Sequence, residues 1–382
     1  MKNYSRAETI ELVFSGTNYF QLLETIIEQC RTVLHLQTYI FETDTTGLRI
    51  IEALKHASKK GVKVYLLVDA FGSNSFSKKV SAELKACGIH FRKFSPLFST
   101  ENIYFGRRLH YKVVVADRRT ALIGGINIAD KYNESTKTDP WLDYAVLTKG
   151  SACEYLHGLC EKTFHKQKKN LLFNTESKTP VQNQEGSKLL RFRLNDFIKG
   201  SNEIHQGYKE ALISATHNVT IIASYFLPGH GFRKLLANAS ARGVKIRIIL
   251  AGQSDVYSVR LAGNYLYDFL LRNNIQLYEW TNSVLHGKAM LVDDQWATIG
   301  SYNLNFLSHY ISVELNAEIR DKAFIRTFTD HLDNIINSSC NAVDLKNHAR
   351  KINPFNKFLM WLAYIFFRTL MNLTVNRKRK RR

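Results

Sequence analysis

The chain repeats itself, and this repeat constrains the fold more than any other feature of the sequence. Residues 33–68 and 219–250 each contain an apolar run that ends in aromatic residues, an amphipathic stretch, a Gly-Val-Lys triplet and a second apolar run. Gly61 in the first copy and Gly243 in the second suit the end of a helix that leads directly into a buried strand. Each copy therefore predicts a β-α-β unit, and the whole chain predicts an α/β fold with helices covering mixed sheets.

The repeat also predicts the domain organisation. A chain of 382 residues is long enough to form two cores. The residues between the copies are polar and include Pro180, as is typical of a boundary. We expect a first half over residues 1–168, a linker over 169–190, a second half over 191–345 and a C-terminal tail over 346–382.

A set of polar residues recurs downstream of each β-α-β unit with the same spacing. A His is followed by a Lys, an Asp, a Gly and an Asn at +2, +7, +14 and +17, which are His110, Lys112, Asp117, Gly124 and Asn127 in the first copy and His286, Lys288, Asp293, Gly300 and Asn303 in the second. With 13 His, 30 Lys and 15 Asp in the chain, the His-x-Lys-x4-Asp pattern is expected by chance roughly 0.04 times. Two copies are therefore not an accident of composition.

These residue types suit chemistry on a phosphate diester. Alternation along a strand places the His and the Lys of each copy on the same face, so two such strands would bring two His and two Lys to one cleft. A phosphodiester needs a nucleophile, an acid for the leaving oxygen and fixed positive charge on the remaining oxygens. Asn127 and Asn303 can add amide hydrogens, and the glycine-rich turns can bring backbone N–H groups close to the anion.

On these residues the chain resembles the phospholipase D superfamily, whose signature is a duplicated HxKxxxxDxxxxxxGxxN pattern. Within it, residues 124–132, 140–146, 300–305 and 312–319 are similar to bacterial cardiolipin synthases. The resemblance covers about residues 20 to 335. It implies two similar phospholipase D-like halves, each a mixed sheet flanked by helices, packed with pseudo-twofold symmetry around one active site.

The resemblance also implies a reaction without metal or cofactor. The expected route is a two-step displacement through a covalent phosphatidyl-histidine, with His110 as nucleophile and His286 as acid and base, although the reverse order is the open alternative. The resemblance assigns to Asp143 and Glu314 the orientation of the histidine of the opposite half. Asp117, although part of the catalytic motif, is expected to hold the motif loop, and so is Asp293.

The two copies differ at one position, where the first has Gly125 and the second has Ser301. The resemblance implies that the Ser301 hydroxyl binds phosphate together with Asn127 and Asn303. Because glycine offers no hydroxyl, we expect the two half-sites to be unequal.

The chain is strongly basic and ends in an apolar segment followed by cations. Its formal charge is +20, of which residues 377–382 (RKRKRR) contribute six, and such a field attracts polyanions. The uncharged run over residues 358–367 would make a helix of about 15 Å, half of the roughly 30 Å of a bilayer core. The tail therefore predicts an interfacial helix on an anionic membrane, with a domain-capping helix as the alternative.

The predicted function is a phosphatidyltransferase that makes cardiolipin and glycerol from two molecules of phosphatidylglycerol. A phospholipase D-type hydrolase is the nearest alternative, and a nuclease or other nucleic-acid phosphodiesterase is disfavoured by the apolar tail. We expect a peripheral protein on the cytoplasmic side of the cell membrane, and the sequence predicts no particular oligomeric state. No metal site is expected, and His35 is expected to be a filler. Tyr39, Phe41, Tyr225 and Phe226 are expected to belong to the core, with the lining of an acyl-chain or headgroup cleft as the alternative.

Overall fold

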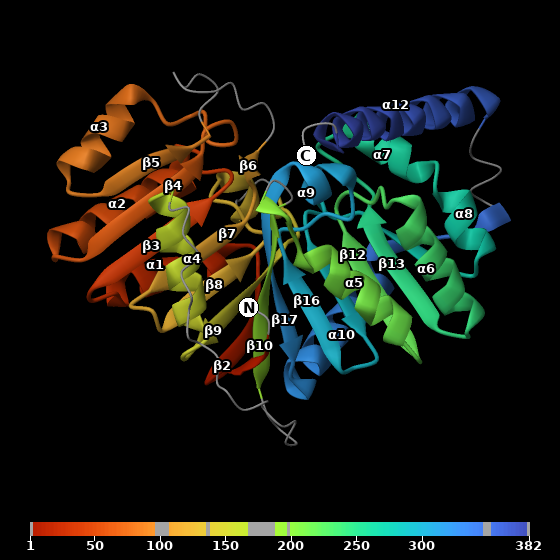
Figure 1. Ribbon diagram of the computed structural model, residues 1–382, viewed down its shortest axis with the longest axis horizontal. Helices are drawn as coiled ribbons and strands as arrows, with labels where there is room; N and C mark the ends of the chain where they lie inside the picture. The colour runs from red at the N-terminus through yellow and green to blue at the C-terminus, as the bar shows by residue number, and fades with distance from the viewer. Residues whose placement is uncertain are drawn as a thin grey trace.

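Two β-sheets, one from each half of the chain, form the frame of the molecule, with helices packed against them (Figure 1). The structure is a computed structural model that describes residues 3–95, 107–134, 138–166, 188–196, 199–346 and 353–379. The first half is coloured red to yellow in Figure 1 and the second green to blue, and the two lie side by side.

The first sheet has seven strands in the order β2-β9-β8-β7-β3-β4-β5, with parallel and antiparallel neighbours. Its strands are β2 (Thr9–Phe14), β3 (Val33–Thr38), β4 (Lys63–Asp69), β5 (His90–Phe94), β7 (Lys112–Ala116), β8 (Thr120–Gly124) and β9 (Tyr144–Lys149). The helices of this half are α1 (Thr17–Gln29), α2 (Thr45–Lys59), α3 (Lys78–Ala86) and α4 (Cys153–Phe164), with a 3-10 turn η1 (Asp130–Tyr132).

The second sheet has the order β1-β10-β17-β16-β15-β12-β13-β14-β18, with β11 beside β10 and β6 beside β17. Its strands are β1 (Ser5–Arg6), β6 (Arg108–Leu109), β10 (Leu189–Asp196), β11 (Ser201–Asn202), β12 (Asn218–Ala223), β13 (Lys245–Ala251), β14 (Gln276–Trp280), β15 (Lys288–Val292), β16 (Trp296–Gly300), β17 (Ser312–Arg320) and β18 (Cys340–Val343). The helices are α5 (Glu203–Ser214), α6 (His230–Ala241), α7 (Tyr257–Asn264), α8 (Tyr267–Arg272), α9 (Phe306–Tyr310), α10 (Lys322–Ser339) and α12 (Pro354–Arg379).

The duplication predicted from the sequence is present in the topology. The run β10-β17-β16-β15-β12-β13-β14 repeats the connectivity of β2-β9-β8-β7-β3-β4-β5. Both predicted β-α-β units form, as β3-α2-β4 and β12-α6-β13. Gly61 and Gly243 each have φ 91°, a left-handed conformation that glycine adopts freely at the end of a helix.

The largest apolar cluster lies between the two sheets and holds them together. It combines side chains of both halves, for example Val113 and Val115 on β7 with Ala289 and Leu291 on β15. Two further clusters lie under the outer helices, one beneath α1 and α2 and one beneath α5 and α6. Each sheet is therefore buried on both faces, which explains why its central strands are apolar without alternation.

The two halves exchange short segments at their boundary. The first strand of the chain, Ser5–Arg6, pairs with β10 in the second sheet, and Arg108–Leu109 pairs with β17. Strand β10 begins at Leu189, inside the predicted linker of residues 169–190. The halves thus deviate in detail from the predicted ranges, since residues 5–6 lie in the second sheet. Residues 169–187 of the predicted linker lie outside the described part of the chain.

Helix α12 lies across α7 at the top of the second half in Figure 1. The Tyr364 ring stacks on Tyr265 with 4.8 Å between ring centroids. Among the described residues, none of the helices combines the length and the apolar character that crossing a membrane requires.

Candidate active site

The two motif histidines lie where the halves meet, each directly after a segment that pairs with the other half. Leu109 is aligned with Val313 of β17 in a parallel pair, and the His110 backbone N–H donates to the Val313 carbonyl at 2.9 Å. Leu285 forms the corresponding bridge with Leu142, and the His286 N–H donates to the Leu142 carbonyl at 2.8 Å. The backbone thus fixes both histidines by the same kind of cross-half pairing.

This pairing places each histidine beside a carboxylate of the opposite half, because Glu314 follows Val313 and Asp143 follows Leu142. His110 Nδ1 lies 2.8 Å from Glu314 Oε2, and His286 Nδ1 lies 2.5 Å from Asp143 Oδ2. Both carboxylates are fully buried. A carboxylate at Nδ1 favours the tautomer with hydrogen on that nitrogen, so Nε2 of each imidazole keeps its lone pair for chemistry.

Burial shifts the pKa of both histidines and of Asp143. Burial lowers the pKa of His110, and the Glu314 carboxylate offsets only part of this decrease. Burial and the positive charge of Lys288 together lower the pKa of His286 well below 6.5. Burial also raises the pKa of Asp143 to about 6. At neutral pH both histidines are therefore neutral imidazoles, and Asp143 is ionised.

The two motif lysines are buried at the same place. Lys112 is 3% exposed and its Nζ donates to the His110 carbonyl at 2.5 Å, while the Lys288 Nζ donates to the His286 carbonyl and lies 3.9 Å from Asp143 Oδ2. Burial, reinforced by the charge of Lys288, lowers the pKa of Lys112 to about 7. The positive charges of two ammonium groups repel each other in one buried site, and an anion that binds there relieves this repulsion.

The motif aspartates lie at the other end of the motif strands and hold their turns. The Asp117 carboxylate accepts backbone N–H groups of Arg31, Thr32 and Val33 at 2.7 to 3.1 Å, in the loop before β3. Although burial opposes it, hydrogen bonding by Thr32 and these N–H groups lowers the pKa of Asp117 to about 2. Asp293 accepts the equivalent N–H groups of residues 216–218 before β12. Both are positioning residues that lie away from the histidines.

The motif asparagines are buried and tie the site to the loops that follow β3 and β12. Asn127 Oδ1 accepts the Ile40 N–H at 3.1 Å, and its Nδ2 donates to the Tyr132 hydroxyl at 2.8 Å. Asn303 Oδ1 accepts the Ser224 hydroxyl at 2.8 Å. Binding of phosphate by Asn127 and Asn303 stays a prediction.

Strand register shows which residues of the two halves are equivalent. Gly124 pairs with Ala145, and Gly300 pairs with Asn316. Counting from these pairs, the equivalent positions are Gly125 with Ser301 and Asp143 with Glu314.

The difference between Gly125 and Ser301 follows from the carboxylate beside each. A Cβ added to Gly125 would lie 2.3 Å from Asp143 Oδ1, so the carboxylate occupies the space of a side chain there. In the second half the Ser301 hydroxyl instead donates to Glu314 Oε2 at 2.5 Å. The Ser301 hydroxyl is thus engaged by the carboxylate that contacts His110, and binding of phosphate by Ser301 stays a prediction.

Aromatic rings line both histidines, although none of them was assigned to the site from the sequence. The Tyr39 ring centroid lies 4.9 Å from that of His110, and Lys112 Nζ lies 5.5 Å from the Tyr39 centroid. On the other side, the rings of Tyr132 and Trp141 lie 5.3 and 6.1 Å from His286. Assigning Tyr39 to the core was therefore wrong. The available signal was its place directly after β3, at the end of the sheet where His110 lies.

Of the other aromatic residues of the repeat, Phe41 and Phe226 belong to the core and Tyr225 does not. Phe41 and Phe226 are buried in the core, as expected. Tyr225 is half-buried, and its hydroxyl donates to Asp255 Oδ1 at 2.5 Å.

Comparison with known proteins places the chain in a family. A family model described as "Cardiolipin synthase, PLD-like domain" matches residues 23–139 and 208–336. The chain is 33% identical over 346 residues to cardiolipin synthase B of Shigella flexneri and of Escherichia coli K12, which covers 90% of this chain and 84% of theirs. It is 25% identical over 339 residues to the probable cardiolipin synthase YwiE of Bacillus subtilis, which covers 87% of this chain and 66% of that protein.

Solved structures share the fold at low identity. A phosphatidylserine synthase of Haemophilus influenzae superimposes with a TM-score of 0.77 at 14% identity, covering 97% of this chain and 96% of that one. A polyphosphate kinase of Porphyromonas gingivalis superimposes with a TM-score of 0.62 at 17% identity, covering 88% of this chain and 49% of that one. These likenesses support the two-half architecture and nothing further.

Proposed function

This chain belongs to the family of PLD-like cardiolipin synthases, and from that premise we propose that it is a phosphatidyltransferase that makes cardiolipin and glycerol from two molecules of phosphatidylglycerol. One observation carries the proposal: two histidines, each bonded to a carboxylate of the opposite half, lie beside two buried lysines. This set provides a nucleophile, an acid and two fixed positive charges, as phosphodiester exchange requires.

In the first step we assign the nucleophile to His110. Its side chain is 15% exposed, against 8% for His286, so its Nε2 is the more accessible to a lipid phosphate. A bond forms between Nε2 and phosphorus, the bond from phosphorus to the glycerol headgroup oxygen breaks, and protonated His286 gives its proton to that oxygen. The negative phosphate offsets the lysine charges that depress the pKa of His286, and so favours the protonated imidazole that this step needs.

In the second step the headgroup of another phosphatidylglycerol replaces the departed glycerol. His286 Nε2, now neutral, takes the proton from a hydroxyl of this acceptor as its oxygen attacks phosphorus. The phosphorus–nitrogen bond breaks, cardiolipin is formed and His110 is regenerated. One phosphodiester replaces another, so the exchange needs no nucleotide.

The remaining residues support these two steps. Lys112 and Lys288 hold the phosphate oxygens, and Glu314 and Asp143 keep each imidazole in the Nδ1–H tautomer. Ser301 helps to position Glu314 through the hydrogen bond that its hydroxyl donates to that carboxylate. We propose that Asn127 and Asn303 also lie close to the bound phosphate, because their hydrogen bonds hold them beside the loops that follow β3 and β12.

A rim of exposed apolar side chains supports action on a membrane surface. This apolar rim consists of Phe71, Val256 and Tyr257 with the α12 residues Phe355, Phe358, Trp361, Leu362 and Phe366. Phe71 follows β4, Tyr257 begins α7 after β13, and α12 lies on α7, so the rim lies at the carboxyl ends of these strands. Lys288 pairs with Ala223 at the carboxyl end of β12, so the site lies at the same end of the sheets.

We therefore infer that the apolar rim contacts an anionic bilayer and brings the site to the headgroups. Aromatic residues suit the headgroup level, and the cations of residues 377–382 would add about 1 kcal/mol each near an anionic leaflet. The five cysteines are free thiols, which favours a reducing compartment and so the cytoplasmic side of the cell membrane.

The test is to give purified protein vesicles of phosphatidylglycerol without added metal or nucleotide, and to identify the products by mass spectrometry. Cardiolipin with an equal amount of glycerol is expected. Phosphatidic acid as the only new lipid would replace the transferase with the hydrolase. Cleavage of single- or double-stranded DNA with no lipid product would favour the nuclease.

A further inference from the structure

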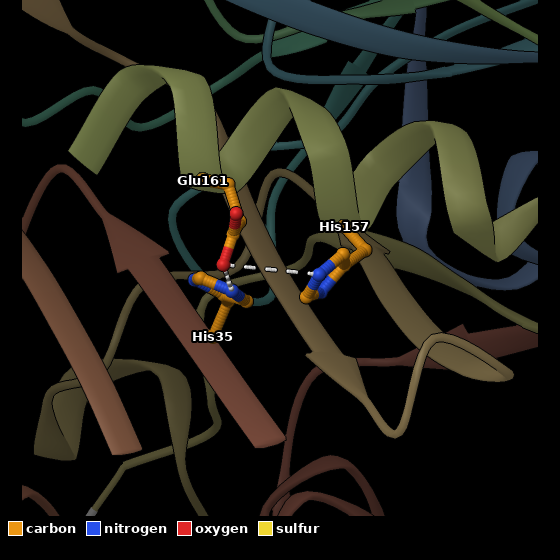
Figure 2. A group of neighbouring side chains, drawn as sticks. All are labelled: His35, His157 and Glu161. Carbon is orange, nitrogen blue, oxygen red and sulfur yellow. Dashed lines mark ion pairs between the residues drawn. The ribbon is translucent and has the colours of Figure 1, made fainter. Parts of the chain in front are cut away.

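Three side chains with metal-binding donors meet in the first half, outside the active site (Figure 2). His35 projects from β3, and His157 and Glu161 project from one face of α4 at the i, i+4 spacing. His35 pairs with Val115, near the end of β7 that leads to Asp117 and not the end that carries Lys112. The group therefore lies away from the end of β7 that carries Lys112, and it shares no residue with the catalytic set.

The imidazoles of this group are buried, and three of their four ring nitrogens have no hydrogen-bond partner among the described residues. His35 is 0% exposed and His157 is 6% exposed. Neither Nδ1 nor Nε2 of His35 has a partner, and Nδ1 of His157 has none. Leaving a buried polar atom unsatisfied costs about 1–3 kcal/mol, so the orphaned His35 Nε2, which faces the Glu161 carboxylate, indicates a ligand that supplies the missing interaction.

The donor atoms converge on one point. Glu161 Oε1 lies 3.9 Å from His35 Nε2 and 3.9 Å from His157 Nε2, as the dashed lines in Figure 2 show, and all the donor atoms lie within 4.8 Å of one another. Bonds of 2.0–2.1 Å to a tetrahedral ion would place donors roughly 3.3 Å apart. A small rotation of Glu161, whose side chain is 38% exposed, can shorten both of its distances, whereas the separation of the two imidazole nitrogens shortens only if the rings themselves turn toward the ion.

We propose that His35, His157 and Glu161 bind a zinc ion through the two Nε2 atoms and one carboxylate oxygen, with water as the fourth ligand. Neutral imidazoles and a carboxylate are donors that suit zinc among the divalent ions. The sequence predicted no metal site, because His35 lies far along the chain from His157 and Glu161.

The proposed ion supports the active site by joining α4 to β3. Gln37, two residues after His35, donates from Nε2 to the Cys160 carbonyl of α4 at 2.7 Å and accepts the Tyr111 hydroxyl at 2.7 Å. Tyr111 stands between His110 and Lys112 in the chain. Zinc bound at His35 would thus hold α4 against β3, and β3 in turn contacts Tyr111 between the catalytic His110 and Lys112.

The test uses the full-length chain without a histidine tag, stripped of metal and titrated with zinc by calorimetry. One zinc per chain is expected, with a rise in Tm. Glu161→Gln keeps the size of a half-exposed side chain and should weaken binding at least tenfold and abolish the Tm rise. His157→Gln should do the same, whereas His56→Gln, on the exposed face of α2, should bind zinc like the wild type.

Cobalt as a probe distinguishes this site from the catalytic histidines. The wild type and His56→Gln should show the intense visible absorption of tetrahedral cobalt, and Glu161→Gln should lose it. Equal near-ultraviolet circular dichroism of the metal-free proteins shows that the variants are folded. The proposal is overturned if the wild type binds no stoichiometric zinc, or if folded Glu161→Gln and His157→Gln bind zinc as tightly as the wild type.

Discussion

His286 and Asp143 belong to opposite halves of the chain, yet His286 Nδ1 lies 2.5 Å from Asp143 Oδ2. His110 and Glu314 repeat this relationship at 2.8 Å. Each imidazole therefore depends on the other half for its orientation, and the carboxylate charges are as much a part of the site as the duplicated motif.

Removing either carboxylate charge is expected to slow the reaction strongly. Asp143→Asn and Glu314→Gln keep the side-chain size but no longer fix the Nδ1–H tautomer, and we expect kcat to fall about 10²- to 10⁴-fold. Cardiolipin formation under saturating phosphatidylglycerol measures kcat. Asp139→Asn, an exposed carboxylate near Asp143, is the matched control and should retain activity. A loss below threefold in both variants would contradict the orienting role.

The assigned roles predict different fates for the two histidine variants. His110→Ala should form no covalent phosphatidyl-enzyme, because the nucleophile is absent. His286→Ala should still form it slowly and turn it over slowly, because only the acid and base is absent. Acid quenching with labelled lipid, followed by peptide mass spectrometry, locates the adduct. Label on His286 would reverse the two roles.

The lysine pKa predicts the alkaline limb of the pH profile. Because Lys112 has a pKa lowered to about 7, it loses its charge as pH rises above 7, and kcat/KM should fall there. Lys112→Arg should move this limb to higher pH, whatever its effect on the maximal rate, since guanidinium stays charged. Lys245→Arg, on an exposed position of β13, is the control. An alkaline limb unchanged in Lys112→Arg would assign it to another group.

The unequal half-sites predict unequal effects at Gly125 and Ser301. A methyl group at Gly125 meets the Asp143 carboxylate at 2.3 Å, so Gly125→Ala should displace Asp143 from His286 and lower kcat at least tenfold. Ser301→Ala loses the hydrogen bond to Glu314 and the one that its Oγ accepts from the Leu315 N–H, but it introduces no steric conflict and should lower kcat only several-fold. Circular dichroism verifies folding of both. Equal effects would show that Asp143 moves aside without cost.

The apolar rim predicts how the protein binds vesicles. Replacing Phe358 and Trp361 with Ser should lower sedimentation with phosphatidylglycerol vesicles at least tenfold, since burying each such side chain is worth about 1.5–3 kcal/mol. Removal of residues 355–382 should lower it further. Ile213→Ser is the control, because Ile213 is 59% exposed but lies before β12, at the opposite end of the strand from Ala223. Unchanged sedimentation of the Phe358 and Trp361 variant would place the membrane contact elsewhere.

The sequence predicted the parts of the molecule that are encoded locally or by duplication. Gly61 and Gly243 mark helix ends that the structure has, and the matched offsets after His110 and His286 identify the motif strands that the halves bring together. The apolar runs predicted the buried strands because helices or the other sheet cover both faces.

Contacts between distant segments could not be predicted in this way. The exchange of Ser5–Arg6 into the second sheet depends on pairing with β10, which no local pattern encodes. The engagement of Ser301 with Glu314 depends on the length of that carboxylate side chain. The contact of Tyr39 with His110 and the meeting of His35 with His157 and Glu161 depend on the packing of β3 beside β7 and α4.

The cross-half pairs also mean that the site is completed late in the synthesis of the chain. A ribosome finishes His110 and its whole first motif well before it reaches Glu314, the residue that orients that imidazole. A nascent or truncated chain that ends before Glu314 thus has His110 without the carboxylate that contacts its Nδ1, and the site is complete only once β17 has joined the second sheet.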